Sequence, residues 1–156
     1  ALADQGWTTA QKLAGSTWAR RAKVLNSAGY ARYDERTAAM LGVTADLLVD
    51  RYGGDLRKLR DEAGHDPAAE RRLLKQCKGM GDVGVDIFFR EVQGAWDELY
   101  PFVDKRAAAG ADALGLPTDA KRLRRLVDRD DFTRFVAALV RVRQERDADE
   151  VIAAAS

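Results

Sequence analysis

The close alternation of helix starts and helix stops constrains this fold more than any other feature of the sequence. Serine, threonine and aspartate, the favoured N-caps of α-helices, stand before helical stretches. We expect N-caps at Thr8, Ser16, Asp34, Asp66 (followed by Pro67), Asp104, Thr118 and Asp130. Glycines that can end helices follow at Gly15, Gly29, Gly53-Gly54, Gly64, Gly79 and Gly115. Together these signals predict roughly eight or nine short helices without a long linker.

Residue usage supports an all-α class, since alternating β-type runs are missing and alanine, leucine, arginine and aspartate dominate. The 156 residues, 46% of them hydrophobic, suffice for the core of one ordinary domain. We therefore predict a single all-α domain over residues 1–156, a compact bundle of short helices with its longest helix at 33–52. The tail from Asp147 to Ser156 is expected to fray. The apolar stripes expected to face the core are Leu41, Ala45, Leu48 and Tyr52, and Phe132, Phe135, Val136, Leu139 and Val140.

Charge and metal-binding residues exclude several classes of function. The formal net charge is +1, so only local clusters of charge could indicate nucleic-acid binding. A single Cys77 and a single His65 rule out an internal disulfide, a zinc site built on thiolates and a four-cysteine iron–sulfur cluster. We expect no metal site made by side chains. No apolar run has membrane-spanning length and no signal peptide is visible, which favours an intracellular protein without membrane partners.

Residues 73–93, LLKQCKGMGDVGVDIFFREVQ, contain two glycines one residue apart between two helical patterns. We expect the first helix at about 67–77 and the second from Asp82 or Val83. Glycines permit positive φ and leave no side chain in the way. Such a turn can direct backbone N–H groups at one phosphate. A tight turn whose glycines serve only packing is the alternative.

Helical spacing assigns the faces of these two helices. Arg71, Lys75 and Lys78 share one face and would flank the anion site with positive charge. In the second helix, Asp82, Asp86 and Arg90 are expected to point away from the core, and Asp82 adds a negative charge beside the anion site. The buried stripe would be Val85, Phe88, Phe89 and Val92.

The stretch LLKQCKGMGDVGVDIFF resembles the helix-hairpin-helix motif of the endonuclease III-like DNA glycosylase superfamily. GYARYDERTAAMLGVTADLLVDRYGGDLRKL resembles the helix and loop that lead to that hairpin. PFVDKRAAAGADALGLP is similar to the family's Pro-hydrophobic-Val-Asp segment and its following helix. These segments cover most of residues 29–117. The resemblance implies a helix-hairpin-helix at about 67–92, and that the helices which precede this region in the family are missing here.

The resemblance also implies base-excision repair, in which a damaged base is flipped from duplex DNA into a pocket. Asp104 would be the catalytic carboxylate, stabilising the cationic sugar or activating water. The hairpin carbonyls would hold a monovalent cation, the only cofactor implied. Tyr100 and Phe102, which precede Asp104, are candidates for a base pocket or for the core. The DNA-binding residues would be Lys75, Lys78, Gly79, Met80 and Gly81.

Departures from the family pattern narrow the expected activity. Val83 (or, with a slight shift, Asp82) stands where bifunctional members have a nucleophilic lysine, so we expect a monofunctional glycosylase without a lyase step or an iron–sulfur cluster. Lys105-Arg106 replaces the usual Thr-His after Asp104, and Asp104 reads equally well as a simple N-cap. A non-catalytic helix-hairpin-helix DNA-binding protein and an all-α protein–protein adaptor are the alternatives.

The expected partner is double-stranded DNA, bound by a cytoplasmic, nucleoid-associated monomer. Two further basic runs, Arg20-Arg21-Lys23 and Lys121-Arg122-Arg124-Arg125, would flank a DNA groove or form solvated helix faces.

Overall fold

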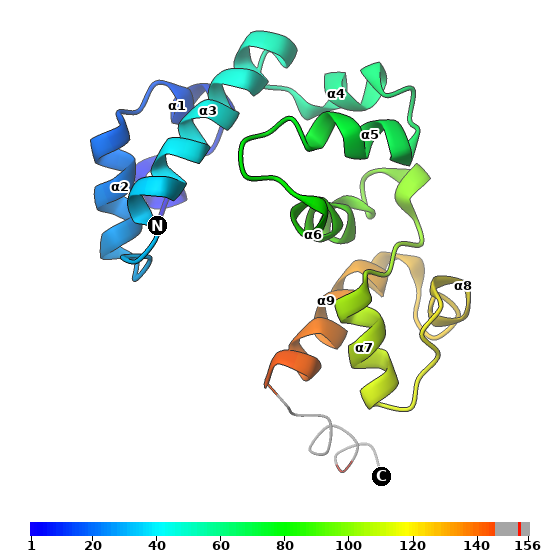
Figure 1. Cartoon of the computed structure of the whole chain (residues 1–156). Helices are drawn as coiled ribbons and strands as arrows, with labels where there is room; N and C mark the ends of the chain where they lie inside the picture. Colours follow the sequence, from blue (N-terminus) through cyan, green and yellow to red (C-terminus); the bar gives the residue numbers. More distant parts are fainter. Residues whose placement is uncertain (146–152, 154–156) are drawn as a thin grey trace. The chain divides into compact units, whose positions relative to one another are not determined.

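The computed structural model describes residues 1–145 and Ala153, and every regular element in these residues is helical (Figure 1). The predicted all-α class is confirmed. By its internal contacts the chain divides into two compact units, Ala1–Asp82 and the remainder from Val83. The predicted fraying tail lies outside the described residues apart from Ala153. No described helix combines the length and the apolarity needed to cross a membrane.

The first unit is built around α3 (Asp34–Tyr52), the longest described helix, as the sequence predicts. The helices α1 (Ala10–Ala14) and α2 (Trp18–Ser27) pack along it (Figure 1). Small residues of α3 face these neighbours, including the buried Ala38, Gly42 and Ala45. A short 3₁₀ turn, Ala3–Gln5, precedes these helices, and α4 (Leu56–Glu62) and α5 (Pro67–Leu74) follow.

Arg21 departs from its sequence-based interpretation, because its side chain is neither solvated nor part of a DNA groove. The residue is 7% exposed. Its Nε donates to the carbonyl of Ala38 at 2.9 Å, and its Nη1 donates to the carbonyl of Ser16 at 2.5 Å. A Cβ on Gly42 would overlap the Arg21 guanidinium, so this glycine provides the space that the buried cation occupies. Hydrogen bonds to carbonyls offset the cost of removing the charge from water.

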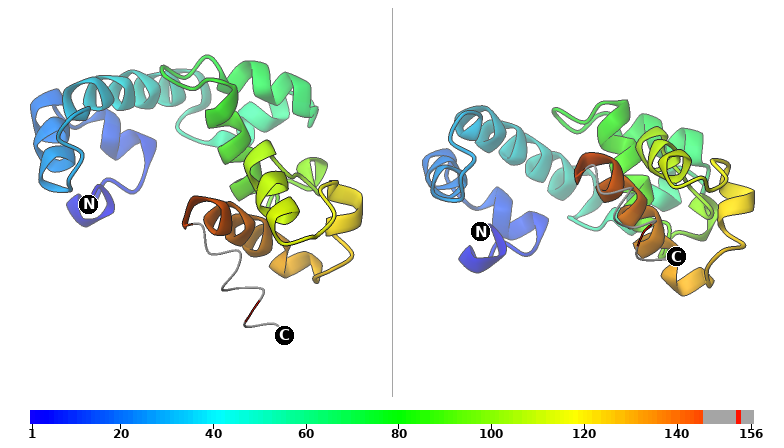
Figure 2. Two further views of the ribbon diagram at one scale, coloured as in Figure 1. Left: turned by 60° about the horizontal axis from the view of Figure 1, so that its bottom comes forward. Right: turned by 90° about the horizontal axis from the view of Figure 1, so that it is seen from below.

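The second unit contains most of α6 (Asp82–Val92), and then the 3₁₀ turn Asp97–Leu99, α7 (Lys105–Ala113), α8 (Ala120–Leu123) and α9 (Arg129–Glu145). α7 packs along α9 (Figure 1 and Figure 2). The apolar stripe predicted near residues 132–140 is confirmed as part of this core, although Phe135 is only partly buried against it. The buried residues of the core are Ala107, Ala111, Leu123, Phe132, Val136, Leu139 and Val140.

The helices are capped by the residue types that the sequence predicts, but several caps lie at other positions than predicted. Asp66 and Asp104 cap α5 and α7 as predicted. The predictions of Asp34 and Asp130 as N-caps were wrong, because both residues lie inside their helices, α3 and α9, and the N-cap position of α3 is Tyr33. In the three remaining places the cap lies one residue later than predicted, because the capping residue is the one whose extended backbone lets its side chain reach an N–H two or three residues on. The observed caps in these places are Thr9, Thr17 and Asp119.

Candidate functional site

The loop between α5 and α6 contains the two closely spaced glycines. α5 ends at Leu74, three residues before the expected end. The chain then continues in tight i→i+3 turns, with the N–H of Cys77 donating to the carbonyl of Leu74 at 3.0 Å. A second such bond runs from the N–H of Met80 to the carbonyl of Cys77, also at 3.0 Å. The residues from Lys75 to Gly81 form this loop, which we call the 75–81 loop.

The two glycines of the loop have different structural requirements. Gly79 has φ of 87°, a left-handed conformation that side chains disfavour, and a Cβ there would overlap the sulfur of Met40. Gly81 has no such φ, and a Cβ on it would meet nothing within 4 Å. The first glycine is therefore required by the turn. Gly81 leaves its backbone exposed at the surface, and no packing contact accounts for a glycine at this position.

The basic face predicted beside this loop is partly neutralised. Lys75 Nζ lies 2.9 Å from Asp82 Oδ1, and Arg71 Nη1 lies 3.7 Å from the same oxygen. Lys75 thereby holds the pKa of Asp82 below its usual value. Lys78 is exposed and enters none of the ion pairs among the described residues. Of the predicted basic face, Lys78 is the cation most open to an external anion.

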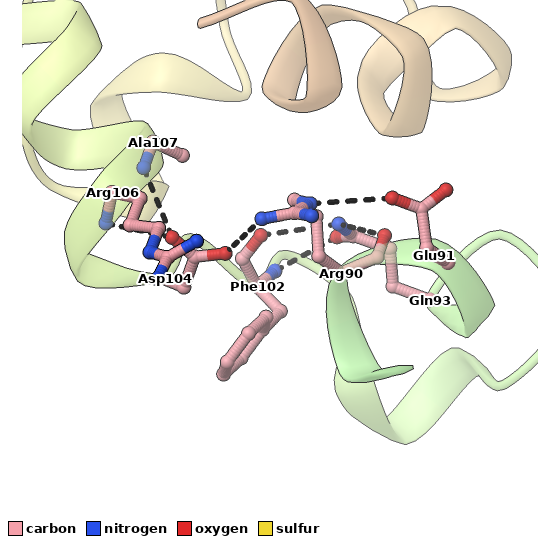
Figure 3. Close-up of polar contacts among 7 residues, drawn as sticks. All are labelled: Arg90, Glu91, Gln93, Phe102, Asp104, Arg106 and Ala107. Carbon is pink, nitrogen blue, oxygen red and sulfur yellow. Dashed lines mark hydrogen bonds and ion pairs between the residues drawn. The ribbon is translucent and has the colours of Figure 1, made fainter. Parts of the chain in front are cut away.

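Asp104 caps α7 with one carboxylate oxygen and binds an arginine with the other (Figure 3). Its Oδ1 accepts the backbone N–H groups of Arg106 at 2.7 Å and Ala107 at 3.0 Å. Its Oδ2 accepts Nη1 of Arg90 at 2.5 Å. The side chain is 4% exposed. Both oxygens therefore already have strong donors, two of which lie at the positive end of a helix.

The prediction that Arg90 faces away from the core was wrong. Arg90 is 8% exposed, and besides Asp104 its Nε contacts the Glu91 carboxylate at 3.3 Å. The buried face of α6 is wider than its apolar stripe, because the chain that follows the helix returns along its end. No local pattern signals this pair, since its partners are 14 residues apart with a loop between them.

Gln93 holds the returning segment in place (Figure 3). This fully buried amide donates through Nε2 to the carbonyls of Arg90 and Phe102 at 3.0 and 3.1 Å. Its Oε1 accepts the N–H of Phe102 at 2.9 Å. The three bonds fix the backbone two residues before Asp104, and so place the carboxylate opposite Arg90.

The packing of Tyr100 and Phe102 favours the core role over the base pocket. The Phe102 ring lies edge-on to Phe89 with centroids 5.5 Å apart. Tyr100 packs edge-on to Phe132 at 5.3 Å and lies under the guanidinium of Arg129 at 4.6 Å. Both rings thus have aromatic partners within the second unit.

A cavity of about 240 Å³ lies beside Asp104, between α6 and the start of α7. Neither Tyr100 nor Phe102 belongs to its lining. The cavity is slightly smaller than the pockets of about 300 Å³ and more that usually hold small ligands. Val83 shares the lining with Asp104. The lining residues are Val83, Asp86, Ile87, Asp104, Lys105 and Arg106.

Comparison of the chain with models of protein families, with curated proteins and with solved structures gave no match. Within the part of the chain that the structure describes, no group of three or more histidine, cysteine, aspartate or glutamate side chains is placed to hold a metal ion. The fold places the chain in the all-α class. The resemblance to DNA glycosylases stays a prediction.

Proposed function

We propose that this chain binds double-stranded DNA through the 75–81 loop, as a non-catalytic protein of helix-hairpin-helix type. The observation that carries the proposal is the form of this loop. Gly79 turns the chain, Gly81 leaves the backbone uncovered, and the exposed Lys78 stands beside them. Backbone N–H groups with an adjacent cation suit a phosphate group, which carries no base identity.

The state of Asp104 supports the non-catalytic form of this proposal. A carboxylate that stabilises an oxocarbenium ion must present its negative charge to the sugar. Here Arg90 and two backbone N–H groups already compensate that charge, and the side chain is almost fully buried. These bonds give Asp104 a structural role, which explains the residue without a catalytic one.

DNA binding through the loop is tested by the paired substitution Lys78→Gln with Gly81→Glu. Both positions are exposed and Gly81 has open space, so the fold should persist. We expect duplex affinity to fall by about tenfold, equally for unrelated sequences, and the salt dependence to weaken by about one phosphate contact. Fluorescence anisotropy over a range of salt concentrations measures both quantities.

The control is Lys121→Glu at an exposed lysine of the second unit. It changes the formal charge by the same two units as the loop variant without touching the loop. Equal affinities for the loop variant and the wild type, with unchanged circular dichroism, would contradict the proposal.

A base-excision glycosylase is the second candidate, favoured by the cavity that Val83 and Asp104 both line. Under our proposal, the chain should release no base from duplexes carrying alkylated, oxidised, deaminated or mismatched bases, as read by alkali cleavage. With Val83 in place of a lysine, borohydride should trap no covalent complex with an abasic duplex.

Val83→Trp decides between the two candidates, because Val83 is 56% exposed and tryptophan would fill the cavity from its rim. Base release by the wild type that is lost in Val83→Trp would establish the glycosylase. A trapped complex that disappears in Lys105→Ala would identify Lys105, also in the lining, as an amine nucleophile.

A further inference from the structure

Arginines from three helices of the second unit line one groove. The groove has a volume of about 450 Å³ and lies between α6, α7 and α9. None of its arginines belongs to the basic runs that the sequence makes visible. Its lining is Ile87, Arg90, Glu91, Arg106, Arg134, Ala137, Val140 and Arg141.

The groove concentrates positive charge in a chain whose total charge is close to neutral. Its four arginines and one glutamate give the lining a formal charge of +3. Arg90 is committed to Asp104 and Glu91. Arg106 and Arg141 are exposed and form none of the ion pairs recorded among the described side chains. Two cations are therefore available to an external ligand.

Arg134 adds a third available cation. Its Nη1 lies 3.3 Å from Asp131 Oδ1, but the two side chains are 86% and 61% exposed. Pairs as open as this contribute little stability and exchange readily with other partners. Arg134 can thus turn to a ligand in the groove at small cost.

The geometry of these arginines fits a phosphodiester chain. Guanidinium groups bind phosphate oxygens with two parallel hydrogen bonds, which favours arginine at phosphate sites. Arg134 and Arg141 are seven residues apart on α9, which corresponds to about 10 Å along the helix axis. That length equals about three base-pair steps along the axis of a DNA duplex. Arg106, at the start of α7, is the third available arginine of the groove, beside Arg134 and Arg141.

We propose that this groove is a second contact for the phosphodiester backbone of DNA, separate from the 75–81 loop. The inference rests on the proposed function in taking DNA as the ligand, but not on the loop. Its phosphate contacts read no sequence and raise affinity through the release of counterions.

The test is the triple variant Arg106→Gln, Arg134→Gln, Arg141→Gln, whose three side chains are exposed. The matched control, Arg122→Gln, Arg124→Gln, Arg125→Gln, removes the same charge from exposed positions outside the groove lining. For the groove variant we expect duplex affinity to fall at least about tenfold and the slope of log K against log salt to decrease by about 2 to 3. The control should change that slope by less than about one. Circular dichroism verifies the fold of both proteins.

Each outcome separates this inference from the loop proposal. If the groove variant and the control variant bind duplex DNA equally well, the groove proposal is wrong, whether or not the loop variant is weakened. A weakened groove variant beside an unaffected loop variant retains the groove and contradicts the loop. A wild-type chain without duplex affinity overturns both. Direct binding of poly-glutamate as tight as that of a duplex of equal charge would assign the groove to an acidic protein and overturn DNA as its ligand.

Discussion

The Asp104→Asn protein is expected to unfold roughly 10 °C below the wild type, a loss of about 3 kcal/mol in the free energy of unfolding. Asparagine preserves the size of the side chain and its ability to cap α7. A capping role alone would therefore change stability by well under about 1 kcal/mol. The substitution removes the charge opposite Arg90, which is 8% exposed and would keep only Glu91 at 3.3 Å. A buried cation that loses its partner is costly.

Asp66→Asn is the matched control for this prediction. Asp66 caps α5 by accepting the N–H of Ala69 at 2.9 Å, but it is exposed and has no arginine in its described bonds. Thermal and urea unfolding should show a small effect at Asp66 and a large one at Asp104. The double variant Arg90→Met with Asp104→Asn should recover part of the loss, because it removes both charges together.

Equal effects at the two caps would mean that the Arg90–Asp104 pair contributes nothing to stability. The result also bears on enzymology. If Asp104→Asn unfolds the second unit, a loss of base release in that variant would be no evidence of catalysis. The cavity variant Val83→Trp is the cleaner test of the glycosylase candidate for that reason.

Gly110→Ala is expected to destabilise the chain by about 3 kcal/mol. Alanine in place of a helical glycine normally stabilises by up to about 1 kcal/mol, so helix propensity alone predicts the opposite sign. Gly110 lies in α7 where the helix crosses α9, and an added Cβ would overlap the backbone carbonyl of Leu139. Because backbone cannot rotate away as a side chain can, the two helices must separate and lose contacts in the core.

Asp112→Ala on the same helix is the control, because this exposed residue does not reach the crossing. It should leave stability unchanged or raise it slightly through helix propensity. Urea unfolding followed by circular dichroism measures both variants. A Gly110→Ala protein as stable as the Asp112→Ala protein would show that α7 and α9 do not need this close approach.

The sequence determined the all-helical class, the long helix of the first unit and the apolar stripe of α9. Each of these follows from neighbours within about one helical turn, where propensity, capping and periodicity act directly. Asp66 and Asp104 were recognisable as caps for the same reason. The need for a glycine at residue 79 was also visible, although the overlap with Met40 from α3 was not.

Only the tertiary structure decided which charged residues are buried and which share a surface. Arg21 enters the first unit through the space left by Gly42, and Arg90 meets Asp104 across a loop. The groove joins arginines that lie as far apart in sequence as residues 90 and 141. No rule based on local spacing brings such residues together, because their distance depends on how separate helices pack and on where a returning segment such as that held by Gln93 places its side chains.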